Sequence, residues 1–281
     1  MINKEMVLKA DLHTHTTYSD GILKPDELLS LVKEKGLSAI SIVDHDTLDG
    51  NLVAQGICSD YGIEVIMGCE FSCYENGKEY HLLGYGFDPT DKQINNHLDN
   101  YRIARLTRAK QIHKKLVNIG AGISFDDILI TADKAPVARP HIASVLVQKG
   151  YAADLKDAFM KFLGEGCPAY YPKAVFPVEM AIKMINKAKG VAVLAHPRNY
   201  IDQPTLYKFI QSGLDGIEVN HPSHSEEQKK FYHYVASQYW LLETGGSDYH
   251  GSREFDATNI GNFFVPYSVV ESIKYHTNRL F

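Results

Sequence analysis

Short apolar runs alternate with longer amphipathic stretches along most of this chain. Seven runs have the length and composition of β-strands, and they cover residues 6–8, 39–43, 64–67, 80–85, 191–195, 216–220 and 240–244. Between them, apolar residues recur every three or four positions, as they do on one face of a helix. Such alternation is typical of parallel β/α units and not of an antiparallel meander.

The first predicted helix has clear signals at both ends. Pro25 suits the first turn, and Gly36 suits the position just beyond the last turn. The apolar positions between them share one face and are Leu28, Leu29 and Val32. Comparable patterns predict helices near residues 48–61, 177–189, 203–212 and 225–238. In a β/α barrel, the loops after the strands would meet at one face, where such folds place their functional groups.

The alternation of strands and helices is interrupted between residues 91 and 172. This segment has little strand character, and a helical pattern extends over residues 94–119. We therefore predict a main β/α domain built from residues 1–90 and 173–281. The segment 91–172 is expected to be a helical insertion that contributes to the substrate pocket.

Basic residues in the insertion are candidates for binding an anion. In Arg139-Pro140-His141, Pro140 favours a helix start, which leaves Arg139 and His141 at the N-terminal end of that helix. The free N–H groups of a helix start and the planar fork of an arginine both suit phosphate oxygens. Pro at a helix start is common for purely local reasons, however, so this motif gains weight only from a metal site that it would serve. A three-residue spacing, usual for a solvated helix face, relates Arg102, Arg105 and Arg108. For these three, attraction of an anionic substrate is the alternative.

Composition agrees with a globular enzyme. The chain has 281 residues, 44% of them hydrophobic, which is enough for a sizeable core. A net charge of -5 disfavours binding to duplex nucleic acid, although a local basic patch would still accept a small phosphate ester. The N-terminus lacks the apolar core of a signal peptide, and no later segment resembles a membrane span. We therefore expect a cytoplasmic protein without membrane or duplex partners.

Histidine and carboxylate residues recur at the ends of the apolar runs or on the loops that follow. His13 and His15 are two residues apart, so an extended backbone directs both imidazoles to the same side. A single histidine of this kind is usually just a hydrogen-bonded residue, but packing does not explain the whole set. That set consists of His13, His15, Asp20, His45, Glu70, His81, His196, Asp248 and His250. We therefore predict a site for several metal ions.

These ligand types are typical of hydrolases that act on phosphate esters. Two ions about 3.5–4 Å apart share a hydroxide and neutralise the attacking and leaving oxygens at phosphorus. We expect a metal-bound hydroxide to attack, with no side-chain nucleophile. Histidine and carboxylate ligands suit Mn, Fe or Zn. Asp46 and His221 are candidates to orient a ligand or to protonate the leaving group, and for Asp46 a helix cap is the favoured alternative.

The order of these motifs resembles that of the polymerase and histidinol phosphatase (PHP) superfamily of metal-dependent phosphoesterases. The resemblance covers nearly the whole chain and rests on Asp11-Leu12-His13-Thr14-His15, Asp20-Gly21, Asp44-His45-Asp46, Gly68-Cys69-Glu70, His81, Ala195-His196-Pro197 and Ser247-Asp248-Tyr249-His250. It implies an α/β fold, a distorted seven-stranded (β/α)7 TIM-like barrel with two or three divalent ions. By this resemblance, one ion would be held by His13, His15, Glu70 and Asp248. Glu70 would bridge to a second at His81 and His196, and a third would lie at Asp20, His45 and His250.

One branch of the superfamily is most similar to this chain, and it hydrolyses nucleoside 3',5'-bisphosphates. The similarity lies in the insertion, the Arg139-Pro140-His141 motif and residues 218–225. That branch converts adenosine 3',5'-bisphosphate to AMP, and some members trim short single-stranded RNA from the 5' end. The resemblance implies that Arg139 and His141 hold the substrate phosphate, with His224 as a further candidate. Two alternatives remain, namely a histidinol-phosphate phosphatase and a non-catalytic metal-binding PHP module.

Overall fold

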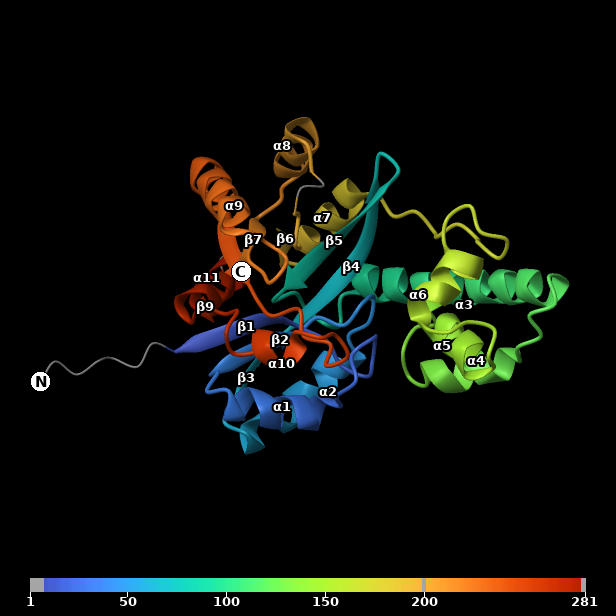
Figure 1. Cartoon of the computed structure of the whole chain (residues 1–281). Helices are drawn as coiled ribbons and strands as arrows, with labels where there is room; N and C mark the ends of the chain where they lie inside the picture. The colour runs from blue at the N-terminus through green and yellow to red at the C-terminus, as the bar shows by residue number, and fades with distance from the viewer. Residues whose placement is uncertain (1–7, 199–200, 279–281) are drawn as a thin grey trace, which may run out of the picture. The chain divides into compact units, whose positions relative to one another are not determined.

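The structure of the chain is a computed structural model that describes residues 8–198 and 201–278 (Figure 1). The chain divides into two compact units. The sheet unit comprises Met1–Asn95 and Phe176–Phe281, and the helical unit comprises Asn96–Val175. Within the described residues, no helix combines the length and the apolar character that a membrane crossing requires.

Two separate sheets form the sheet unit. The first has four strands in the order β3-β2-β1-β9, and the second has five in the order β4-β5-β6-β7-β8. The strands are β1 (Lys9–Thr14), β2 (Ala39–Ile42), β3 (Glu64–Ile66), β4 (Gly68–Glu75), β5 (Lys78–Tyr85), β6 (Val191–Leu194), β7 (Gly216–Asn220), β8 (Leu242–Gly245) and β9 (Val265–Pro266). The prediction of a seven-stranded barrel is therefore wrong, because the described strands form two mixed sheets and no closed barrel.

A hairpin is the physical reason for this difference. β4 and β5 pair antiparallel along their full length, and Asn76 and Gly77 form the turn between them. Both turn residues have positive φ, 49° and 75°, as the tight turn favoured by Asn-Gly requires. β6 also runs antiparallel to β5. The expectation of parallel β/α units alone is therefore wrong for this part of the chain.

Parallel pairing is found in the rest of both sheets, apart from the short strand β9, which is antiparallel to β1. Of the first predicted run, Met6 and Val7 lie outside the described residues, and β1 begins at Lys9. Beyond the strand ends, isolated bridges join Thr14 to Tyr249 and His45 to Glu70. These bridges join the carboxyl ends of β1 and β2 to the segment after β8 and to β4.

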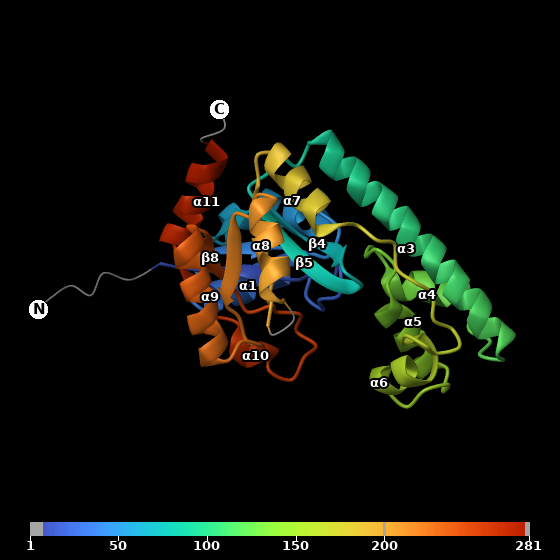
Figure 2. The same ribbon diagram turned by 90° about the horizontal axis from the view of Figure 1, so that it is seen from above.

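Helices pack on the sheets at the predicted places. In α1, Leu28, Leu29 and Val32 are fully buried against Ile40, and Gly36 adopts φ 70° beyond the last turn. α7 packs on β4–β6, and α9 packs on β7 and β8 (Figure 2). The helices of the sheet unit are α1 (Pro25–Glu34), α2 (Asp49–Ile57) with a 3-10 turn at Cys58–Asp60, α7 (Val178–Lys187), α8 (Gln203–Gln211), α9 (Glu226–Tyr239), α10 (Asp256–Asn259) and α11 (Ser268–Asn278).

The helical unit has a hydrophobic core of its own. Its buried residues include Ile112, Leu116, Ile142 and Leu146. Pro140 lies in the first turn of α5, where the sequence predicts a helix start. The helices of this part of the chain are α3 (Lys92–Asn118), α4 (Phe125–Ala132), α5 (Arg139–Gln148) and α6 (Leu155–Ala158), followed by a π-helical turn at Phe159–Leu163. A contribution of these helices to the substrate pocket stays a prediction.

Candidate metal centre

All nine predicted ligands lie in the sheet unit, and the structure brings them together. Each belongs to at least one group of three or four side chains whose ligand atoms lie within 4.8 Å of one another. The groups are His13-His15-Asp248, His13-Glu70-His196, His45-Glu70-His81, His15-Asp20-His45-His250 and His13-Glu218-His221. Several residues belong to more than one group, as expected for closely spaced ions.

His13 and His15 each present an imidazole nitrogen to carboxylate oxygens of Glu70 and Asp248. Glu70 Oε2 lies 3.3 Å from His13 Nε2 and 3.2 Å from His15 Nε2. Asp248 Oδ1 lies 3.3 Å from each of the same two nitrogens. Ligand atoms bonded at about 2.0–2.1 Å to a tetrahedral ion are themselves about 3.3 Å apart. The four imidazole–carboxylate distances therefore match the spacing of ligand atoms around one divalent ion.

The hydrogen bonding of His13 supports the same conclusion. Its Nδ1 lies 2.9 Å from Oε1 of the fully buried Glu218, and a carboxylate only accepts, so Nδ1 carries a proton. In a neutral ring, the lone pair on Nε2 then faces two carboxylates, Glu70 and Asp248. Either a proton on Nε2 or a metal ion between Nε2 and the two carboxylates compensates this arrangement, because burial of the unpaired charges would be unfavourable.

The pKa shifts have the same electrostatic cause. Burial alone would lower the pKa of His15, but the carboxylates of Asp248 and Glu70 raise it to about 9. Burial alone would raise the pKa of Glu70, but His45 and His81 hold it well below its ordinary value. Imidazole and carboxylate groups therefore stabilise each other's charged forms where the ligand atoms converge. A proton neutralises one ligand there, whereas a divalent ion interacts with four at once.

Glu70 joins the first group to a second. Its Oε2 faces His13 and His15, while its Oε1 lies 2.7 Å from His81 Nδ1 and 3.1 Å from His196 Nε2. The side chain is 1% exposed, so these imidazoles and not bulk water surround it. One oxygen toward each group is the arrangement of a carboxylate that bridges two ions.

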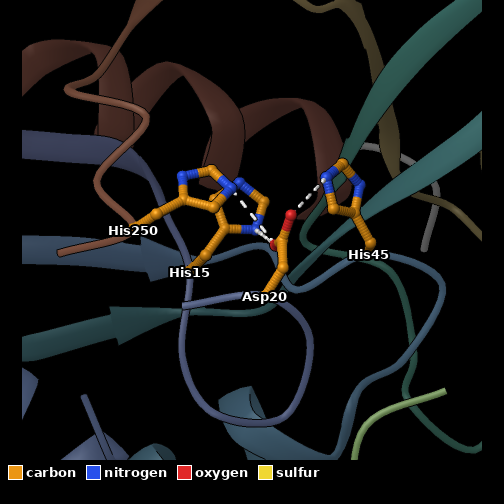
Figure 3. Close-up of side chains that lie close together, drawn as sticks. All are labelled: His15, Asp20, His45 and His250. Atoms are coloured by element: carbon orange, nitrogen blue, oxygen red, sulfur yellow. Dashed lines mark ion pairs between the residues drawn. The ribbon is translucent and has the colours of Figure 1, made fainter. Parts of the chain in front are cut away.

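His15, Asp20, His45 and His250 form a third group (Figure 3). Asp20 Oδ1 lies 3.2 Å from His250 Nε2 and 3.9 Å from His15 Nδ1, and its Oδ2 lies 3.9 Å from His45 Nε2. Figure 3 shows the carboxylate of Asp20 between His45 and the other two imidazoles. The spacing is wider than in the first group, and Asp20 is 33% exposed. This group is therefore the least compact of the three.

The turn before Asp20 is held by a buried carboxylate. Asp44 accepts hydrogen bonds from the N–H and hydroxyl of Thr16, at 2.8 and 2.6 Å, and from the Ser19 hydroxyl at 2.6 Å. Because Asp44 follows β2 and Thr16 follows β1, these bonds join two neighbouring strand ends. They fix the loop that presents Asp20 to the third group.

A cavity of about 340 Å³ opens beside the ligands. It is lined by His45, Glu70, His81, His196, Arg198, Asp248 and Arg253. The two arginines therefore face the same space as members of all three ligand groups. Guanidinium donors match the oxygens of a phosphate group, so the cavity suits an anionic ester.

Glu218 and Arg253 have no role in the sequence prediction, although both contact ligands. Glu218 Oε2 accepts a hydrogen bond from the backbone N–H of His196 at 2.8 Å, in addition to its bond with His13. An acid inside the apolar run 216–220 is a signal that identifies such a residue, because glutamate is almost never fully buried without a partner. Arg253 lies on a loop three residues after His250, and its sequence context gives no comparable signal.

Asp46 does not cap α2. That helix has Leu48 as its N-cap residue, without a side-chain cap bond. The carboxylate of Asp46 instead accepts hydrogen bonds from the N–H and hydroxyl of Ser72, both at 2.8 Å. The preferred expectation of a helix cap is therefore wrong, and the side chain fastens the loop after β2 to β4.

His221 lies in the position of a ligand-orienting residue. Its Nδ1 accepts the backbone N–H of Ser223 at 3.1 Å, so the proton of the neutral ring is on Nε2. That Nε2 lies 3.4 Å from Asp248 Oδ2, on the carboxylate whose Oδ1 faces His13. His221 therefore constrains the carboxylate of Asp248 from outside the first group.

His224 is buried, and both of its ring nitrogens have backbone partners. Nε2 accepts the N–H of Arg198 at 3.2 Å, and Nδ1 lies 3.0 Å from the carbonyl oxygen of Val219. Arg198 has φ 46°, an unusual conformation for a residue other than glycine. His224 thus holds the turn that carries Arg198, and its contact with substrate stays a prediction.

Arg139 and His141 belong to the helical unit. Arg139 Nη1 donates to the carbonyl oxygen of Leu163 at 3.3 Å, and its guanidinium lies over the ring of Phe159. His141 Nδ1 accepts the N–H of Ala138 at 3.1 Å. These contacts support the start of α5, and substrate binding by either residue stays a prediction.

Comparison with known proteins assigns this arrangement to a family. The family model described as PHP domain matches residues 11–162. The chain belongs to the PHP family.

Two curated relatives resemble this PHP protein over most of its length. A 5'-3' exoribonuclease from Haemophilus influenzae is 32% identical over 250 residues, which is 87% of this chain and 91% of the relative. A 3',5'-nucleoside bisphosphate phosphatase from Chromobacterium violaceum is also 32% identical over 250 residues, 87% of this chain and 88% of the relative. A solved structure from Bifidobacterium adolescentis, assigned to the metal-dependent phosphoesterases, has a TM-score of 0.86 at 31% identity and covers 95% of this chain and 96% of its own.

These similarities confirm the predicted enzyme class. The PHP protein is a metal-dependent phosphoesterase, and its chemistry uses divalent metal ions. The alternative of a non-catalytic module is therefore not supported.

Proposed function

We propose that this PHP enzyme removes the 3'-phosphate from nucleoside 3',5'-bisphosphates and converts adenosine 3',5'-bisphosphate to 5'-AMP. The observation that carries the proposal is the convergence of four ligand atoms, from His13, His15, Glu70 and Asp248, beside a cavity lined by two arginines. Further support is the 32% identical relative that is named for this activity. The proposed cofactors are two or three ions of Mn, Fe or Zn.

Each group of side chains has a proposed part in the reaction. The first ion would bind to His13, His15, Glu70 and Asp248, the second to Glu70, His81 and His196, and the third to Asp20, His45 and His250. When bound, the ions would polarise the phosphoryl group and make water a stronger nucleophile at neutral pH. Glu218 keeps a proton on His13 Nδ1, which leaves Nε2 for coordination.

Anionic substrate would be bound by arginine and histidine side chains. Arg198 and Arg253 line the cavity and would donate N–H groups to phosphate oxygens. We propose Arg139 and His141 as additional contacts to the second phosphate. His224 would act by holding the turn of Arg198.

Trimming of short single-stranded RNA from its 5' end is the second candidate. The relative from Haemophilus influenzae, 32% identical, is named for a 5'-3' exoribonuclease activity. Removal of a 3'-phosphate and release of a 5'-terminal nucleotide both break the bond between O3' and phosphorus. One metal centre is therefore sufficient for both reactions.

Parallel assays test the proposal. The Mn-loaded protein is incubated with adenosine 3',5'-bisphosphate, 5'-AMP, histidinol phosphate and a short 5'-phosphorylated oligoribonucleotide, and the products are identified. We expect 5'-AMP from the bisphosphate with little further loss of phosphate. Asp248→Ala should abolish the release of phosphate without changing the circular dichroism spectrum. Lys208→Ala, on the exposed side of α8, should release phosphate as wild type does. Preference for histidinol phosphate would overturn the substrate assignment.

A further inference from the structure

Arg253 makes direct contact with two of the proposed metal ligands. Its Nη1 lies 2.6 Å from Asp248 Oδ2, and its Nη2 lies 2.9 Å from His250 Nε2. The side chain is 50% exposed and lines the cavity beside the ligands. A cationic side chain thus occupies a position next to the atoms that would bind a divalent cation.

The protonation of His250 follows from its other contact. Its Nδ1 lies 2.7 Å from the backbone carbonyl oxygen of Asp248, which only accepts, so Nδ1 carries a proton. The lone pair of the neutral ring is therefore on Nε2, and Arg253 Nη2 donates to it. The same nitrogen lies 3.2 Å from Asp20 Oδ1 in the third ligand group. One lone pair binds either an N–H group or a metal ion, but not both.

We propose that Arg253 competes with a metal ion for His250 and thereby sets the occupancy of the third proposed ion site, at Asp20, His45 and His250. The inference rests on the proposed ligand set. An ion enters this group only after Nη2 leaves His250, and the positive guanidinium also repels an ion at that place. Arg253 therefore determines whether the enzyme holds two ions or three at a given metal concentration.

The effect should be confined to this group. Arg253 bonds Asp248 through Oδ2, whereas Oδ1 of the same carboxylate faces His13 and His15. The first group is therefore compatible with the Arg253 contact. His81 and His196 complete the second group on the Oε1 side of Glu70 and share no ligand atom with His250.

The loop that carries Arg253 is held independently of its guanidinium. Oδ2 of the buried Asp256 accepts hydrogen bonds from the backbone N–H groups of His250 and Arg253, at 3.2 and 3.0 Å. Replacement of the arginine side chain should leave these bonds intact. The variant Arg253→Met keeps much of the aliphatic stem and removes all donors.

Metal counting tests the proposal without a substrate. Wild type and Arg253→Met are dialysed against increasing free Mn²⁺, and the ions per chain are measured by elemental analysis. We expect the last ion to bind Arg253→Met at a roughly tenfold lower Mn²⁺ concentration, since a hydrogen bond from a charged donor is lost as a competitor. The gain should disappear when Asp20→Asn, which weakens the third group, is combined with Arg253→Met.

Arg198→Met is the matched control, because it removes the same charge from the wall of the same cavity. A smaller shift in Arg198→Met than in Arg253→Met supports direct competition. Equal shifts in the two variants, or an Arg253→Met isotherm that coincides with that of wild type, would overturn the proposal.

A second measurement covers the case in which Arg253→Met does not fold. In wild type titrated with diamagnetic Zn²⁺, the side-chain ¹⁵N signals of Arg253, assigned with Arg253→Lys, should shift as the last ion binds. Unchanged signals at full occupancy would overturn the proposal. Because neither experiment involves hydrolysis, a negative result leaves the proposed phosphatase activity standing, and an inactive enzyme does not decide the competition.

Discussion

Glu218 is a single buried carboxylate that acts on two proposed ligands. One oxygen accepts the His13 Nδ1–H, and the other accepts the backbone N–H of His196, whose φ of 25° is unusual for a residue other than glycine. Burial alone would raise the pKa of Glu218, but His13 and His221 lower it to about 2. The ionised carboxylate therefore accepts both bonds at neutral pH.

Glu218→Gln should lower the affinity for divalent ions roughly 10- to 100-fold, as is typical when a partner of a metal-binding histidine is lost. The amide has one acceptor end, so either His13 or His196 loses its bond. Isothermal titration with Mn²⁺ measures the change. Glu243→Gln is the matched control, because that carboxylate bonds His233 Nδ1 at 2.8 Å on the surface, and its affinity should equal that of wild type. Unaltered affinity in Glu218→Gln would contradict the orienting role.

Asp215 should make stability decrease as pH rises. Burial raises its pKa above the ordinary value of 3.8, so the folded state binds a proton more tightly than the unfolded state. Its contribution to stability is therefore fully present below pH 3.8 and is lost as pH rises through the folded-state pKa. Asn at this position still accepts the Ala192 N–H and does not titrate. Urea denaturation at about pH 4 and pH 7 measures the free energy of unfolding of both proteins. The value for Asp215→Asn minus that for wild type should be larger at pH 7 than at pH 4. A difference that is independent of pH would contradict this.

At the scale of elements, the β4–β5 hairpin depends on its turn. Gly77 has φ 75°, and a Cβ there would meet no atom within 4 Å, so Gly77→Ala changes only the backbone energy. We expect a loss of about 1–2 kcal/mol in the free energy of unfolding. Gly56→Ala is the matched control, since Gly56 also has open space but lies in α2, where alanine should stabilise by about 0.5–1 kcal/mol. Denaturant titration should give opposite signs for the two variants, and equal signs would contradict the turn assignment.

Local sequence signals predicted the helices better than the pairing of strands. Pro25 with Gly36, and Pro140, mark helix ends through constraints that act within one turn. The direction of a strand depends on its partner, and the apolar run at 64–67 concealed that Glu70 lies inside β4. The Asn76-Gly77 pair is a local signal typical of a hairpin, and the sequence prediction did not use it.

In the metal centre, too, local sequence signals predicted candidate residues but not the contacts between distant parts of the chain. Residue type and position near strand ends were sufficient to select nine candidate ligands. Parallel strands bring their carboxyl ends together, which accounts for most of the set, whereas Glu70 and His81 lie inside the antiparallel strands β4 and β5. Glu218 and His13 are 205 positions apart in the chain, so their contact depends on how β1 and β7 meet in the folded unit. Arg253 contacts His250 from a loop whose backbone N–H groups donate to Asp256, and the contact depends on how that loop folds.

At the scale of the whole molecule, metal binding and the helical core belong to different units. All nine proposed ligands lie in the sheet unit, and the core of the helical unit consists of its own residues, such as Ile112, Leu116, Ile142 and Leu146. A ligand that binds the native state stabilises the part that unfolds to release it. Divalent ions should therefore stabilise the two units unequally.

Removal of metal should increase hydrogen exchange in the sheet unit and leave the helical core protected. We expect peptides that contain β1, β7 and β8 to exchange faster after chelation. Without the ions, the carboxylates of the site repel one another and the imidazoles lose the metal ion as a partner. Peptides from α5 should exchange at the same rate with and without metal. Hydrogen exchange with mass spectrometry measures both, and Glu218→Gln in limiting Mn²⁺ should reproduce the chelated pattern. Equal loss of protection in both units would contradict the prediction, since it would mean that the ions stabilise one cooperative structure.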